Sequence, residues 1–248
     1  MISLVEKKTI PLVILMGVLV FGCSTKRTPV HVLSTDHVPP RYKVMDNTYW
    51  WTCNFRIVWP DDTAIDWGMD LLLAHAVVSP VLVKHINNIS YWRFHRRAAR
   101  DTSGHQFSFL FYSKPEIASI VLSEIANSKV LEEAYEANLI GIVLIDDPEN
   151  PLLPNVEDTS DRNWSPYLQK NWPSFIMGTS SLWLGLIDES IQDYPEDNAD
   201  IHLLLERYRE VNDKITETWR TEGQHAFLHH LNAIFGYEPL RIRKILSF

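Results

Sequence analysis

Short motifs of well-known enzyme classes are missing from this chain of 248 residues. The patterns G-x-S-x-G and S-x-x-K, which position a serine nucleophile, do not occur. P-loop, G-x-G-x-x-G and EF-hand sequences are absent too, as are internal repeats and low-complexity segments. The sequence therefore gives no support to serine catalysis, nucleotide binding or calcium binding, and no cofactor is expected.

An excess of basic charge is also missing. The chain has 23 Lys and Arg against 31 Asp and Glu, a formal net charge of -8 at pH 7. Nucleic-acid binding needs a basic surface that neutralises phosphates, so no nucleic-acid partner is expected. The length suffices for one large or two small domains.

The first apolar run is too short to span a membrane. It covers residues 10–21 and follows Lys7 and Lys8, whereas a spanning helix needs ~20 apolar residues. A positive start before a short apolar run is typical of a secretory signal peptide. The run closes with Leu19-Val20-Phe21-Gly22-Cys23, which resembles the lipobox of bacterial lipoproteins.

This resemblance, which covers residues 1–25 only, implies a signal peptide over residues 1–22 and lipidation of Cys23. In lipoproteins the modified cysteine becomes the first residue and carries three acyl chains, which anchor far better than one. Ser24, in place of a retaining aspartate, implies the outer membrane, facing the periplasm. The alternative is an ordinary signal peptide with an incidental cysteine.

A lipid on Cys23 would leave Cys53 as the only other cysteine, so no intramolecular disulfide is expected. Removal of residues 1–22 would shift the net charge to -9. Residues 23–47 contain Pro29, Pro39 and Pro40 without helical or strand periodicity, which predicts a lipidated N-terminus and a flexible tether. Fully extended, it would reach about 80 Å.

Residues 48–146 predict an α+β domain with a ferredoxin-like βαββαβ order. Alternation after Thr48 predicts a strand that buries Cys53, and residues 91–113 predict a hairpin with one aromatic face. A first helix is expected to begin at a capping box of Thr63 and Asp66 and to kink or restart at Pro80. A second helix is expected to begin at Pro115, and a buried strand is expected over residues 139–145.

The rest of the chain predicts a helical C-terminal region. Residues 147–172 are rich in Pro, Asp and Asn and predict a long loop. Residues 173–248 are expected to be mostly helical, with an amphipathic stripe over residues 201–219 that ends at Gly223. Gly178, Ser181 and Gly185 are spaced for close helix packing, and residues 240–248 are expected to form an edge strand or a packed tail.

The strongest candidate site is the sheet face opposite the aromatic one. Alternation places basic and polar side chains there, namely Asn54, Arg56, Arg93, His95, Arg97 and Tyr112. Several guanidinium groups on one face would bind an anion, because arginine forks onto carboxylate or phosphate. The alternative is internal ion pairing with the C-terminal helices, since residues 146–222 hold 17 acidic and 6 basic side chains.

Four weaker candidates have plainer explanations. His225 and His229 have the i, i+4 spacing of metal ligands, but a pair alone does not make a site. Asp146 and Asp147 follow a strand, where aspartates accumulate in turns. His95, Asp101 and His105 could form an acid/base group at the hairpin, but residues 101 and 105 are expected in a solvent-exposed turn. His75 lies in an apolar run and is expected to form a hydrogen bond with a neighbour in the core.

These observations favour a membrane-anchored envelope lipoprotein with a non-catalytic binding or structural role, whose partners are the membrane and an envelope protein. The alternative is an envelope enzyme that acts on an anionic substrate through the arginine and histidine face. If acidic helices cover this face, its arginines have a structural role. If His95 is exposed beside a carboxylate in a concave pocket, the enzyme is favoured.

Overall fold

A computed structural model describes residues 47–195 and 199–239. The predicted signal peptide, Cys23, nearly all of the tether and the tail after residue 239 lie outside the described residues. The description below therefore concerns the globular part of the chain.

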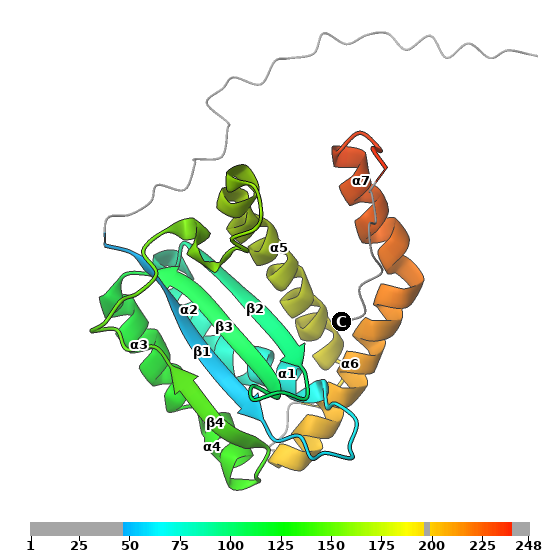
Figure 1. The fold of residues 1–248 in the computed structure, drawn as a ribbon. Helices are drawn as coiled ribbons and strands as arrows, with labels where there is room; N and C mark the ends of the chain where they lie inside the picture. The colour runs from blue at the N-terminus through cyan, green and yellow to red at the C-terminus, as the bar shows by residue number, and fades with distance from the viewer. Residues whose placement is uncertain (1–46, 196–198, 240–248) are drawn as a thin grey trace, which may run out of the picture. The chain divides into compact units, whose positions relative to one another are not determined.

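The domain is built on a four-stranded antiparallel sheet, which confirms the mixed α+β class (Figure 1). The strands are β1 (Tyr49–Ile57), β2 (Tyr91–Ala98), β3 (His105–Ser113) and β4 (Ile140–Ile145), in the spatial order β2-β3-β1-β4. β2 and β3 form the expected hairpin, and their connection has six residues. Because this number is even, the aromatic residues of β3 lie on the same face of the sheet as those of β2, as the strand register shows.

The aromatic face of the sheet is the core. Phe55, Phe107, Phe109 and Phe111 are fully buried there together with Cys53, as the alternation predicted. Burial raises the pKa of the Cys53 thiol to about 12, so this cysteine is an inert core residue.

Two helical stretches cover this face. The first comprises α1 (Gly68–Leu72), a π-helical segment (Leu73–Val78), α2 (Ser79–His85) and a 3-10 turn (Ile86–Asn88); the second comprises α3 (Pro115–Ala126) and α4 (Lys129–Glu136). Pro80 lies in the first turn of α2, directly after the π-helical segment, so a new helical segment starts at this proline without a break in the chain of helical residues. Residues 68–88 are long and apolar enough for a membrane span by length and composition, but half of that stretch is buried in the domain.

The C-terminal helices belong to the same core. They are α5 (Pro166–Ile191), α6 (Ile201–Gly223), a π-helical segment (Gln224–His229) and α7 (His230–Ile234), preceded by a 3-10 turn (Val156–Thr159). Ile187 of α5 and Leu205 of α6 are buried among the sheet aromatics. His75 contacts the Tyr208 hydroxyl through Nδ1 at 2.8 Å, which confirms the expected core histidine.

Several predicted helix boundaries are wrong. Thr63 does not cap a helix, because its hydroxyl donates to the Pro60 carbonyl and the helix begins at Gly68. α5 begins at Pro166 and runs through Pro173. By contrast, α6 ends at Gly223 as predicted, and further helical turns follow it without a break to Ile234.

Two packing predictions are also wrong. β4 is an edge strand whose Ile142 and Leu144 are exposed because they lie on the side opposite the helices, and Ile145 at its end is exposed as well. A Cβ at Gly178 or Gly185 would meet no atom within 4 Å, so these glycines mark no close helix contact. The close contact of a helix lies at Gly68, where a Cβ would stand 2.9 Å from the Arg209 backbone nitrogen in α6.

Candidate functional site

The structure brings the predicted sheet-face residues together. Strand register sets Asn54, Ser108 and His95 in one row across β1, β3 and β2, and Arg56, Gln106 and Arg97 in the next row. The row on the other side contains Thr52, Leu110 and Arg93. Neighbouring strands of a sheet place such cross-strand residues side by side, so this surface, called here the basic sheet face, is continuous.

The acidic C-terminal helices do not cover the basic sheet face. α5 lies along β2 at the edge of the sheet, and α6 lies beyond it against α1 (Figure 1). Ser180 of α5 accepts a hydrogen bond from the Phe94 backbone N–H at 3.1 Å, so α5 supplies a partner to one N–H on the outer edge of β2. The C-terminal helices are therefore placed beside the sheet and on its aromatic side.

The arginines of the basic sheet face have local partners instead. Arg97 forms a bidentate pair with Asp101 of the hairpin turn, with distances of 3.0 and 2.5 Å. Arg56 donates to the Thr102 carbonyl, and Arg93 donates to the Thr159 carbonyl. Within the described residues, none of these arginines pairs with an acidic residue of α5 or α6, which contradicts the expected internal ion pairs.

His95 is the exposed centre of the basic sheet face. Its pKa is lowered, first by partial burial and then by the like charges of Arg93 and Arg97. In the part of the chain that the structure describes, its ring makes no hydrogen bond and no carboxylate stands within hydrogen-bond reach. His95 is therefore available to a ligand but has no group that would orient it as a general base.

Tyr112 does not belong to the accessible part of this face. Its side chain is buried against Trp50 and Tyr91 in a small aromatic cluster. The segment after β4 crosses over this cluster, and the Tyr112 hydroxyl donates to the Pro154 carbonyl at 2.7 Å. Its predicted role in ligand binding is wrong, because this loop shields the first residues of β1 from solvent.

A second polar cluster, missed by the sequence analysis, lies on the aromatic side. Arg96 points to that side with Phe94 and Ala98, although the sheet is otherwise apolar there. Its Nη2 donates to the Trp67 carbonyl at 3.2 Å and to Asn212 Oδ1 at 3.4 Å. The guanidinium carbon lies 4.8 Å and 4.9 Å from the ring centres of Trp67 and Trp183, at cation–π distance.

Behind Arg96 stands a buried carboxylate. Asp70 Oδ2 is 2.9 Å from His105 Nε2 and 3.7 Å from Arg96 Nη2. Both Asp70 and His105 are buried, which corrects the expected exposed position of His105 in the turn. The signal was present in the sequence, because the alternation that assigns Phe94 and Ala98 to the aromatic side assigns Arg96 and His105 to it as well.

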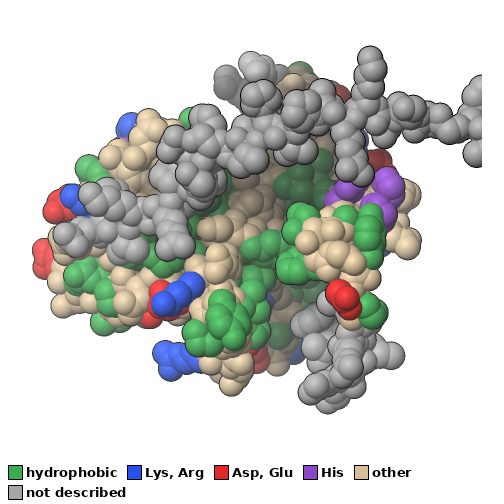
Figure 2. Space-filling model, turned by 90° about the horizontal axis from the view of Figure 1, so that it is seen from above, with side chains coloured by type: hydrophobic (Ala, Val, Ile, Leu, Met, Phe, Trp, Pro, Cys, Tyr) green, Lys and Arg blue, Asp and Glu red, His purple; other side chains and the backbone are tan. Residues whose placement is uncertain are grey.

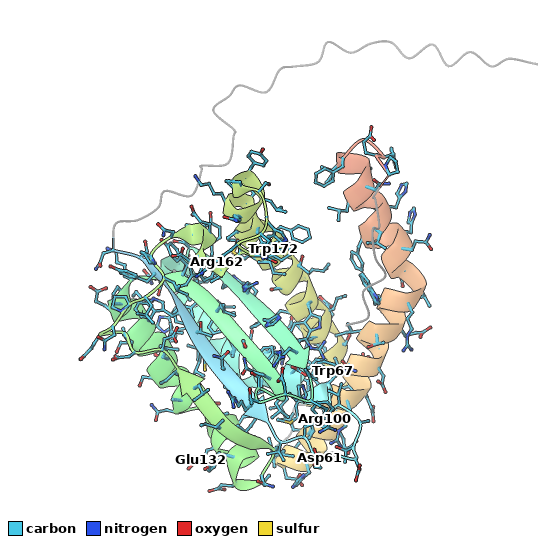
Figure 3. All side chains as sticks on the ribbon, in the orientation of Figure 1. Asp61, Trp67, Arg100, Glu132, Arg162 and Trp172 are labelled. Carbon is cyan, nitrogen blue, oxygen red and sulfur yellow. The ribbon has the colours of Figure 1, made fainter. Side chains whose placement is uncertain are left out.

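Arg96 and Trp67 line a cavity of about 860 Å³. The opposite wall is one face of α6, formed by Asn212, Asp213, Thr216, Glu217 and Arg220. Trp67 lies where the segment before α1 meets α6 (Figure 3). This volume falls within the range of ~300–1,000 Å³ that is usual for small-molecule sites.

The remaining candidates do not form a site in the described residues. His225, His229 and His230 gather at the surface of the C-terminal segment (Figure 2), where the His225 and His229 rings stack at 5.2 Å. No group of three or more His, Cys, Asp or Glu side chains in residues 47–195 and 199–239 is arranged to hold a metal ion. Asp146 accepts from the Thr52 backbone N–H, and burial raises the pKa of its carboxyl group.

No family model, no curated protein and no solved structure matches this chain.

Proposed function

We propose that this protein is a lipid-anchored envelope protein that binds an anionic group of another envelope protein on its basic sheet face. Cys23 supplies the anchor at the outer membrane, and residues 23–47 supply the tether. The observation that carries the binding role is that the basic sheet face is uncovered by helices, with His95 exposed between Arg93 and Arg97.

The cations of this face extend to the hairpin end of the sheet. A cavity of about 430 Å³ opens there, lined by Arg56 and Arg100 together with Asp61 and Asp101. Arg100 stacks on Trp59 at 3.4 Å and donates to backbone carbonyls of residues 59–61, so its position is fixed. Fixed guanidinium groups recognise carboxylates and phosphates with little loss of conformational entropy.

We further infer a ferredoxin-like topology for residues 48–146. The chain order of strand, helix, strand, strand, helix, strand supports it. In this topology the helices cover one face of the sheet and the other face stays free. The C-terminal helices are then an addition that covers the edge of β2.

The enzyme alternative has weaker support. Acid/base chemistry at His95 needs a second group that orients the ring or shares its proton. The nearest turn carboxylate, Asp101, is held by Arg97 and by the backbone N–H groups of Ser103 and Gly104, which keep its pKa below the usual range. Binding by charge and hydrogen bonds requires no such partner.

The proposal is tested with the double variant Arg56→Ala, Arg97→Ala in the full chain. Cross-linking in intact cells, followed by purification of the chain, measures the yield of captured envelope protein. We expect the double variant to lose capture at least about tenfold, because each arginine forms charge-assisted hydrogen bonds worth ~1.5–3 kcal/mol. The control is Lys129→Ala, which removes an exposed cation of α4 paired only with Glu133.

Two further measurements separate binding from architecture. The thermal unfolding of the double variant should stay close to that of the wild type, since exposed ion pairs contribute ~1 kcal/mol or less. Capture by the wild type should weaken as salt rises, because salt screens exposed charges. A double variant that captures as well as the wild type would show that the basic sheet face is not the binding surface.

A further inference from the structure

We propose that the end of the domain at which β1 begins lies against a lipid bilayer, with exposed apolar and aromatic side chains of α5 and α7 in the headgroup region. This contact rests on the proposed lipid anchor, because the anchor holds the domain near a bilayer, but it uses a different surface from the basic sheet face. Two stretches of the chain at this end are exposed, apolar and almost free of charge.

The first stretch is the start of α5 together with the residues just before it. Residues 163–187 contain a single charged side chain, Lys170, although 22% of the chain is charged. A helix without charges around its circumference is usually buried, yet only three residues of this stretch are buried. Near its beginning Tyr167 is 77% exposed, and Leu168 and Phe175 are exposed as well. Exposed apolar surface of this kind marks an interaction site.

The second stretch follows the last turn of α6. Residues 223–237 contain no Asp, Glu, Lys or Arg, and only Gly223 among them is buried. In Figure 1 the tip of α7 lies at the same end of the domain as the start of α5, and Figure 2, seen from above, shows apolar and histidine side chains there. Ile234 is 81% exposed, and the other exposed apolar side chains are Leu228, Leu231, Phe235 and Tyr237.

Hydrogen bonds fix the start of α5 beside the first residues of β1. The Trp50 backbone N–H donates to the Leu153 carbonyl at 2.9 Å, and its indole N–H donates to the Val156 carbonyl at 3.0 Å. The Gln169 side chain donates to three backbone carbonyls of residues 161–164, and the Ser160 hydroxyl donates to the Gln169 carbonyl at 2.8 Å. The exposed side chains of α5 are therefore presented at the point where the chain enters the domain.

This point of entry identifies the occupant as a membrane. The tether over residues 23–47 joins the domain just before β1 and reaches at most about 80 Å from a lipid on Cys23. A linker raises the effective concentration of any weak contact that lies within its reach. Because the linker joins the domain at this end, this end meets the bilayer most readily, and a flat, fluid bilayer can contact both stretches at once.

The side chains at the start of α5 suit the headgroup region of a bilayer. Trp164 and Trp172 meet edge to face with their ring centres 4.7 Å apart, and tryptophan and tyrosine are enriched at membrane interfaces. Arg162 and Lys170 are exposed, and neither forms an ion pair within the described residues. Asp161 is the one acid in residues 160–175, so cations predominate there and can attract anionic headgroups.

The test places a polarity-sensitive fluorophore on the full chain, reconstituted in vesicles of phosphatidylethanolamine and phosphatidylglycerol. Cys23 is occupied by lipid and Cys53 is buried, so an introduced cysteine is the accessible thiol. Labels at Leu168→Cys and Ile234→Cys should shift their emission to the blue and be quenched by brominated acyl chains. A label at Thr102→Cys should do neither, because the β2–β3 turn lies at the opposite end of β1, beyond the pairing of Ile57 with His105.

The unlipidated Cys23→Ser chain separates this contact from the anchor. Labelled at Leu168→Cys, it should show the same blue shift, but only at lipid concentrations at least about a hundredfold higher, because it lacks the linked second attachment. A contact this weak does not hold the chain in the membrane fraction. Equal vesicle binding by the lipidated and unlipidated chains would refute the anchor and leave the contact standing.

Substitutions in the unlipidated chain assign the surface. Tyr167→Ser with Leu168→Ser should weaken vesicle binding at least about tenfold, since two apolar side chains no longer leave water. The matched control is Tyr135→Ser with Ile142→Ser, which are similarly exposed but lie towards the Ile57 end of β1, and it should bind as the parent chain does.

Three results would overturn the membrane contact. The first is a Leu168→Cys label that vesicles leave unchanged in both chains, and the second is a Thr102→Cys label that shifts as much as Leu168→Cys. The third is a blue shift of the Leu168→Cys label when the chain is concentrated without vesicles, which would assign this surface to a second copy of the chain.

Discussion

At the scale of single residues, the two histidines of the hairpin have opposite environments. His95 is exposed beside Arg93 and Arg97, and its pKa is lowered first by partial burial of the ring and then by the like charges of the two arginines. His105 is buried and contacts the carboxylate of Asp70. Strand alternation separates the two by side, because they lie on opposite faces of the sheet. One histidine is thus available to a partner, and the other is a fixed part of the core.

The lowered pKa of His95 predicts a pH dependence of stability. A histidine whose pKa is lower in the folded state than in the unfolded state, where it is ~6.5, binds fewer protons when folded. The free energy of unfolding should therefore fall as the pH drops below about 6.5, and this loss should be smaller in His95→Gln. Chemical denaturation between pH 8 and pH 5 measures both proteins; equal pH profiles would contradict a lowered pKa.

The sequence was sufficient to assign side chains to one face of the sheet or the other, but not to predict how deeply each side chain is buried. Alternation correctly placed Cys53 on the buried side and Arg56 on the open side. It did not show that His105 begins β3, because the end of the hairpin turn depends on Asp101, which accepts hydrogen bonds from Ser103 and Gly104. It also did not show that Tyr112 is covered, since the covering segment is more than thirty residues away in the chain.

At the scale of elements, the two edges of the sheet differ. At the edge of β2, Ser180 of α5 supplies a partner to one backbone N–H, whereas β4 presents an apolar edge with Ile142, Leu144 and Ile145 exposed. The sequence predicted a buried β4 because an uninterrupted apolar run is typical of buried strands. The burial of a strand depends on its place in the sheet more than on its apolar pattern. β4 pairs with β1 at the edge of the sheet, and this pairing cannot be read from the sequence of β4 alone.

The covering of β2 by α5 predicts the effect of Ser180→Ala. This change removes the acceptor of the Phe94 backbone N–H, which is buried, and should lower the free energy of unfolding by ~1–3 kcal/mol. Ser181→Ala is the matched control, because Ser181 is exposed in the same helix and should change stability by less than ~0.5 kcal/mol. Urea denaturation of both variants measures the difference, and equal stabilities would argue against α5 at this edge.

Helix boundaries were harder to predict than helix identity. Thr63 and Asp66 have the spacing of a capping box, yet Asp66 binds Arg209 of α6 at 2.6 Å. Such a tertiary ion pair is invisible to a local pattern, while the other oxygen of Asp66, Oδ1, accepts from the Gly68 backbone N–H at the start of α1. Likewise Pro173 is tolerated within α5, although a proline lacks the N–H of a helical hydrogen bond.

At the scale of the whole molecule, the acidic and basic residues do not meet as the composition suggested. The acidic C-terminal region packs through apolar residues such as Ile187 and Val211 into the core, and the basic sheet face keeps local partners. Within residues 47–195 and 199–239, the basic sheet face therefore gathers cations on one side of the sheet, although the chain has a formal net charge of -8. Such an arrangement steers an anionic partner to one side of the domain, which matters most if the domain is held at a membrane.

The anchor is tested by Cys23→Ser. Without the cysteine there is no acceptor for lipid, and the chain should move from the membrane fraction to the soluble envelope fraction and lose labelled fatty acid. Cys53→Ala is the matched control, because Cys53 is buried in the core and its removal should leave the chain in the membrane fraction. Thermal unfolding should show the reverse pattern. Cys53→Ala should destabilise the domain, because it leaves a cavity in the core, whereas Cys23→Ser should leave the domain as stable as the wild type. Membrane retention of Cys23→Ser would refute lipid anchoring at this residue.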